Sequence, residues 1–183
     1  MLATERWLML PAQKALGFSA NTTDEGEMQQ VKELLAKAKA TLLAYDDTTF
    51  YSRLVSGEAA LVEAWDGWCN YGIAENPKIK FVVPKEGSDV WVDTMVVLAK
   101  SKNLDAAHKF LNFVLRPDSG KSVTELVLYK TPNEVAMRSV KKALAKQFPN
   151  LAIPPKKLLT FETERDLGKA QPLWSRTVSE IVG

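Results

Sequence analysis

Residues 90–98 read Val90-Trp91-Val92-Asp93-Thr94-Met95-Val96-Val97-Leu98, an apolar run that predicts a long extended segment. Trp91 and Asp93 are two positions apart, so on a strand their side chains point to the same face. Trp65 lies before this run and Tyr129 after it, each where a predicted strand or helix ends. Aromatic faces attract a cation and hold its methylene groups, and a carboxylate pairs with an ammonium group. The pattern indicates binding of a small cation rather than catalysis.

The rest of the chain alternates predicted helices with short apolar strands. Helices are expected over residues 4–16, 24–40, 48–55, 104–115, 134–146 and 172–182, and one more runs from a cap at Asp118 or Ser119 to about residue 128. Strands are expected over residues 42–45, 60–65 and 79–83, and residues 149–161 read as a surface connection. Such alternation implies a mostly parallel or mixed sheet covered by helices. The predicted fold class is therefore α/β.

Composition limits the classes of function. The chain has 183 residues, of which 46% are hydrophobic and 25% charged, enough for one sizeable core. Its net charge of +2 comes from 24 basic and 22 acidic residues without a long run of one sign, which gives no argument for nucleic-acid binding. No stretch approaches the roughly 20 apolar residues that span a bilayer. The residues after Met1 lack the basic start and apolar run of a secretion signal.

Residues suited to catalysis or metal binding are scarce. Cys69 is the sole cysteine, which excludes an intrachain disulfide and a cysteine-based zinc site, and a packing role is expected for it. His108 is the sole histidine and lies on the polar side of a predicted helix, where a surface role is favoured. With one cysteine and one histidine, the chain has few residues for catalysis by a nucleophile and a base. We expect neither an enzyme nor a cofactor.

Four further stretches have distinctive sequences: LGFSANTTD at 16–24, VPKEG at 83–87, FLNFVLRPD at 110–118 and YKTPN at 129–133. In this order and spacing they resemble the C-terminal half of the periplasmic spermidine/putrescine-binding components of ABC importers, within the extracellular solute-binding proteins. The resemblance implies a periplasmic-binding-protein-like (type II) lobe, with a mixed sheet flanked by helices. It also implies a crossing segment that belongs to a second, mostly absent lobe.

The resemblance divides the chain between two lobes. Residues 1–91 and 138–183 would form the C-terminal lobe, and residues 92–137 would cross to the other one. A polyamine would be closed between the lobes, with the crossing strand as hinge, and presented to a permease in the membrane. Because such proteins are periplasmic and twice this size, the chain is expected to be a fragment without signal peptide or first half. The isolated fragment is expected to self-associate or to depend on the missing half, and to bind polyamines weakly or not at all.

The resemblance also assigns roles to single residues. Trp65, Trp91 and Tyr129 would line the pocket, and Asp93 would pair with one amine. Taken alone, Trp65 favours core packing, because aromatic side chains bury large areas. Glu164 lies near a family position that contacts the far end of the ligand, although a charged run of this kind is also typical of a solvated surface.

The chain departs from the family in its first helix. Polyamine binders carry one or two carboxylates there, whereas the matching positions here are Thr4 and Trp7. Either Glu5 substitutes through a shifted helix start, or the ligand carries fewer amines than spermidine, which favours a diamine or a monocation. A third interpretation is that Trp7 packs over an apolar or aromatic ligand.

Two other classes of function remain open. An α/β hydrolase or transferase would need a nucleophile elbow, a glycine-rich phosphate loop or a set of metal ligands, and the sequence has none of these motifs. A vestigial or structural interaction module would keep the fold and bind no ligand.

Overall fold

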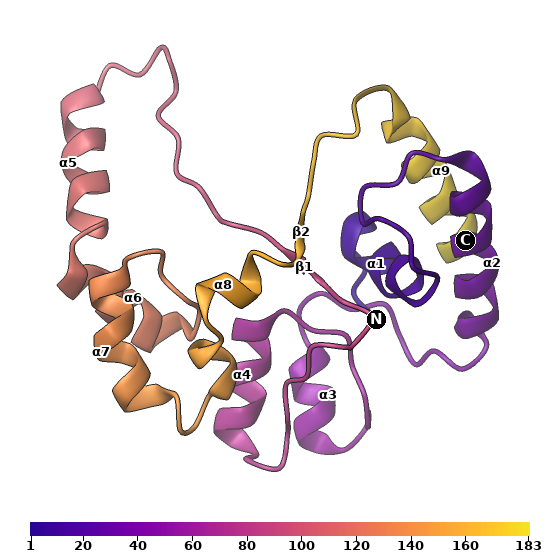
Figure 1. Cartoon of the computed structure of the whole chain (residues 1–183), viewed down its shortest axis with the longest axis horizontal. Helices are drawn as coiled ribbons and strands as arrows, with labels where there is room; N and C mark the ends of the chain where they lie inside the picture. Colours follow the sequence, from indigo (N-terminus) through magenta and orange to yellow (C-terminus); the bar gives the residue numbers. More distant parts are fainter. The chain divides into compact units, whose positions relative to one another are not determined.

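The computed structural model describes the backbone of residues 1–183 and all side chains except those of residues 141–143. Figure 1 shows the elements in chain order. They are α1 (Glu5–Ala15), α2 (Glu25–Lys39), α3 (Phe50–Ser56), α4 (Asp66–Glu75), β1 (Asp89–Val90), α5 (Leu104–Val114), α6 (Pro117–Val127), α7 (Glu134–Leu144), the 3-10 turn η1 (Pro149–Ala152), α8 (Pro155–Leu158), β2 (Glu162–Thr163), η2 (Gly168–Ala170) and α9 (Gln171–Val182). Among the residues described, no helix is both long and apolar enough to cross a membrane.

The described chain forms two compact units. The first unit comprises Met1–Ala64, Val82–Trp91 and Pro154–Gly183, and the second unit comprises Trp65–Phe81 and Val92–Ile153. This division and the predicted lobes share the boundary after Trp91. They differ over residues 65–81 and 138–153, which group with the second unit.

The core of the first unit lies between α1, α2 and α9, which pack against one another (Figure 1). Its buried side chains are Leu8, Met9, Ala12, Met28, Val31, Leu35, Leu167, Trp174 and Ile181. Trp174 is completely buried, and its indole Nε1–H donates to the carbonyl oxygen of Thr22 at 2.9 Å. This one side chain therefore joins α9 to the turn that precedes α2.

Local signals place the helix ends. The side chain of Asp24 accepts a hydrogen bond from the backbone N–H of Glu27 at 2.8 Å, which caps α2 where the sequence predicts its start. Gly57 ends α3 with a φ of 79°, a left-handed conformation that costs glycine little. The predicted caps of α6, Asp118 or Ser119, lie too late in the chain: the helix begins at Pro117, because proline fits the first turn, where its missing N–H is not needed.

The predicted strands are mostly wrong. Residues 42–45, 60–65 and 79–83 carry no strand, and of residues 90–98 only Val90 lies in one. The sheet of the described chain is one short parallel pairing, with Asp89 opposite Glu162 and Val90 opposite Thr163. An apolar run becomes a strand only when a neighbouring backbone accepts and donates its hydrogen bonds. The described residues offer that partner at β1 and β2.

The second unit contains α4, α5, α6 and α7. Side-chain amides hold its loops: Asn70 Nδ2 donates to the Leu128 carbonyl at 2.9 Å, and Asn150 Nδ2 donates to the Asp66 carbonyl at 3.2 Å. By contrast, α5 has no buried residue. Its side chains Phe110 and Phe113 are 60% and 55% exposed, so the apolar stripe of this helix is uncovered.

Candidate functional site

The predicted ligand-binding residues fall in both units. Thr4, Trp7, Trp91 and Glu164 lie in the first unit. Trp65, Asp93 and Tyr129 lie in the second unit. We describe each group within its own unit.

Thr4 precedes the first turn of α1 and binds a carboxylate from a later loop. Its hydroxyl Oγ1 donates to Asp47 Oδ2 at 2.8 Å, and the backbone N–H of Ala3 donates to Asp47 Oδ1 at 2.7 Å. A negative charge is stabilised at this end of the helix by the helix dipole. Thr4 therefore holds an acid beside the position where the family carries one, and both oxygens of Asp47 are already used by hydrogen bonds.

Trp7 also holds a carboxylate that is distant in sequence. Its indole Nε1–H donates to Asp89 Oδ2 at 3.0 Å. The rings of Trp7 and Trp91 meet edge to face, with centroids 5.6 Å apart and an interplanar angle of 67°. Burial raises the pKa of Asp89, and the hydrogen bond from Trp7 opposes that rise. Two aromatic rings and one carboxylate thus meet within the first unit.

Glu164 directly follows β2 and lies beside Arg6. The Arg6 Nε and Glu164 Oε1 atoms are 3.8 Å apart. Arg6 also lies over the ring of Trp174, at 4.5 Å from the ring centroid. Burial raises the pKa of Glu164, the Arg6 guanidinium lowers it, and the nearby Asp89 carboxylate adds to the rise.

The start of α1 lies one residue after its predicted start at Thr4. The helix begins at Glu5, with Thr4 immediately before it. Gln171 Nε2 donates to Glu5 Oε1 at 2.6 Å, which directs that carboxylate toward the start of α9. In the first unit Glu5 Oε1 is thus engaged with Gln171.

In the second unit, Tyr129 packs directly on the first turn of α4. A Cβ atom added to Gly67 would lie 2.1 Å from the Tyr129 ring, so only glycine leaves room for the ring there. Burial raises the pKa of Tyr129, and the carboxylates of Asp66 and Asp93 add to the rise. Trp65 precedes this same helix turn. Gly67 thus makes room for the Tyr129 ring, a role that the sequence did not reveal.

Cys69 and His108 lie where the predicted packing and surface roles place them. Cys69 is buried, and burial raises the pKa of its thiol to about 11, which keeps it neutral at physiological pH. His108 is exposed on α5. Among the described side chains, no group of three or more His, Cys, Asp or Glu is arranged to hold a metal ion.

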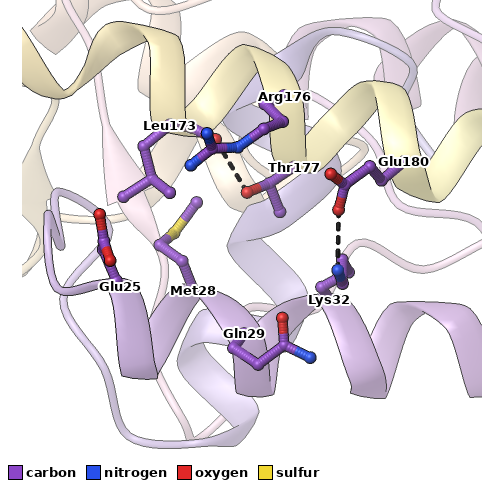
Figure 2. Close-up of a pocket in the computed structure, with 8 residues that line it drawn as sticks. All are labelled: Glu25, Met28, Gln29, Lys32, Leu173, Arg176, Thr177 and Glu180. Atoms are coloured by element: carbon purple, nitrogen blue, oxygen red, sulfur yellow. Dashed lines mark hydrogen bonds and ion pairs between the residues drawn. The ribbon is translucent and has the colours of Figure 1, made fainter.

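A separate hollow lies between α2 and α9, with a volume of about 270 Å³. Figure 2 shows its polar walls and the ion pair of Lys32 Nζ with Glu180 Oε2, which are 2.7 Å apart. Glu25 and Arg176 also line it. Because none of the predicted ligand-binding residues borders this hollow, we regard it as a gap between packed helices.

Residues 2–150 match the family model described as bacterial extracellular solute-binding protein. The chain is 31% identical to the spermidine/putrescine-binding periplasmic protein of Salmonella typhimurium, over 93% of this chain and 49% of that protein. It is 28% identical to the putrescine/cadaverine-binding protein of Pseudomonas aeruginosa, over 90% of this chain and 49% of that protein. The chain spans about half the length of the curated relatives that it matches.

A solved structure gives the same result for the fold. The putative spermidine/putrescine ABC transporter protein from Listeria monocytogenes superposes with a TM-score of 0.86 at 27% identity, over 99% of this chain and 56% of that one. This likeness confirms the predicted α/β, periplasmic-binding-protein-like fold.

Proposed function

The chain belongs to the bacterial extracellular solute-binding proteins, and from that premise we propose that it is part of the substrate-binding component of an ABC importer. The ligand is a polyamine, such as putrescine or spermidine, or a related small organic cation. The whole protein works outside the cytoplasmic membrane and delivers its ligand to a permease. The names of the relatives from Salmonella typhimurium and Pseudomonas aeruginosa support this ligand class.

The proposed mechanism is non-covalent capture without a cofactor. Aromatic rings hold the methylene chain, Asp93 pairs with one amine, and closure of the receptor's lobes presents the complex to the permease. One observation carries the proposal: in the second unit the ring of Tyr129 is fixed against Gly67, within electrostatic reach of the Asp93 carboxylate. A ring face and a negative charge together favour an aliphatic ammonium.

We expect Asp93→Asn to weaken polyamine binding by on the order of 2–5 kcal/mol, because it removes the charge partner of a bound ammonium. Trp91→Ala should also weaken binding, since it removes a stacking surface. Isothermal titration calorimetry with spermidine, putrescine and cadaverine measures both effects. The receptor for this test has two lobes, made by joining the chain to the N-terminal half of one of its relatives.

Asp105→Asn is the matched control for the change in charge, because Asp105 is exposed on α5. An unchanged dissociation constant for Asp93→Asn would show that the assignment of this residue is wrong. No heat with any polyamine, from a folded two-lobe receptor, would favour the alternative of a vestigial interaction module.

Assembly of the isolated chain follows from its uncovered apolar side chains. In the second unit Val96 is 80% exposed, Leu98 76% and Phe110 60%. Contiguous apolar patches on monomeric soluble proteins rarely exceed a few hundred Å². We expect the isolated chain to self-associate, and Phe110→Lys to shift it toward the monomer in light scattering. Leu61→Lys is the control, because Leu61 is 90% exposed in the first unit. A monomer at high concentration would contradict this prediction.

A further inference from the structure

We propose that Asp89 supplies the carboxylate that the resemblance places in the first helix, and that it pairs with a ligand ammonium beside Trp7 and Trp91. The inference rests on the proposed function and names a specificity-determining residue of that site. Trp7 occupies a position at which the resemblance leads us to expect an acid. Its indole N–H binds Asp89, an acid that is distant in the sequence. The separation of 82 residues between them hides this substitution in the sequence.

The backbone and a side chain together fix the position of Asp89. It is the first residue of β1 and pairs in register with Glu162. The indole N–H of Trp7 then binds Oδ2 at 3.0 Å. A neutral donor orients a carboxylate without cancelling its charge. The negative charge of Asp89 therefore stays available to a cation.

Lys14, the cation that acts on the pKa of Asp89, is engaged with another acid. Lys14 lowers the pKa of Asp89 from a distance, but its ammonium forms an ion pair with Glu162 and also donates to the Phe18 carbonyl. In the part of the chain that the structure describes, no ion pair joins Asp89 to a lysine or arginine. A half-buried anion without a cationic partner is costly, so an entering ammonium gains more there than at a solvated acid.

Asp47, the other acid near the start of α1, serves a different purpose. Its two oxygens accept hydrogen bonds from Ala3 and Thr4, so it secures the end of the helix. Asp89, by contrast, binds the indole N–H of Trp7, whose ring meets that of Trp91. Because Asp89 is a single carboxylate, it is expected to pair with one amine of the ligand.

The test titrates the ¹⁵N-labelled 183-residue chain with putrescine and with n-butylamine, and follows the indole N–H resonance of Trp7 by NMR. Weak binding is sufficient for this measurement. We expect a saturable shift of this resonance with both amines. Asp89→Asn should weaken it by on the order of tenfold to a hundredfold. Asparagine keeps an oxygen that accepts from Trp7, so the local fold is retained and the loss reports charge. Asp105→Asn is the control and should match the unchanged chain.

The outcomes separate this inference from the proposed function. If the Trp7 resonance does not move, or moves equally in Asp89→Asn, Asp89 does not contact the amine and the inference is wrong. Calorimetry on the two-lobe receptor would then still report whether a polyamine binds. A receptor that binds putrescine with the same affinity after Asp89→Asn overturns the inference alone. A receptor that binds no amine overturns both.

Discussion

Trp174→Ala is expected to lower the free energy of unfolding of the first unit by about 3–5 kcal/mol, the usual cost of removing a fully buried large aromatic side chain. Trp174 is completely buried between α9 and its neighbours α1 and α2. Its removal leaves a cavity and deprives the Thr22 carbonyl of its indole donor. Because domains are stable by only about 5–15 kcal/mol, this unit should be partly unfolded at moderate temperature. Urea denaturation followed by circular dichroism measures the change.

Trp174→Phe separates the two contributions. Phenylalanine keeps most of the ring but cannot donate to Thr22, so its expected cost is about 1–3 kcal/mol, that of an unsatisfied buried carbonyl. The ring also supports Arg6, which lies between Trp174 and Glu164. Extrapolated free energies of unfolding carry an error on the order of 1 kcal/mol. If the value for Trp174→Ala differs from that of the unchanged protein by no more than this error, the assignment of Trp174 to the core is wrong.

Helices were the most predictable part of the fold, because their signals are local. Asp24 caps α2 through a neighbour three residues away, and Gly57 ends α3 by its own backbone conformation. The strands depended on distant partners. An extended apolar run such as 79–83 has the same sequence pattern whether or not a second backbone lies beside it. The likeness to solved structures confirms the fold class, while most predicted strands are unpaired in the described chain.

Contacts between residues distant in the sequence were also unpredictable in the candidate site. The resemblance identified Trp7 as a departure from the family, but periodicity could not show that its indole binds Asp89. Gly67 was equally hidden, since its importance lies in the Tyr129 ring that packs on it. Both contacts join residues more than fifty positions apart in the chain. A residue's type suggests its chemistry, whereas its partner is set by tertiary packing.

Glu63 is a half-buried acid in the first unit whose charge should make stability depend on pH. Its Oε2 accepts a hydrogen bond from the backbone N–H of Leu2 at 3.1 Å. Burial raises its pKa to about 8. The Leu2 hydrogen bond and the N-terminal ammonium oppose the rise, and the carboxylates of Asp89 and Asp47 add to it. In the unfolded chain the same group has an ordinary pKa near 4.5. Between these two values the folded state holds a proton that the unfolded state has released.

Stability should therefore fall as the pH rises from about 4.5 to about 8, and should stay constant above that range with respect to this group. Each pKa unit corresponds to about 1.4 kcal/mol, so the expected loss is on the order of 5 kcal/mol. Glu63→Gln keeps an oxygen that accepts from Leu2 but cannot ionise, so it should match the unchanged protein near pH 4.5 and exceed its stability increasingly up to pH 8. Urea denaturation across this range measures the difference.

Glu75→Gln, at an exposed position on α4, is the control and should leave the dependence of stability on pH unchanged. Parallel profiles for Glu63→Gln and the unchanged protein would mean that Glu63 is ionised in the folded state, with its charge stabilised by the N-terminal ammonium.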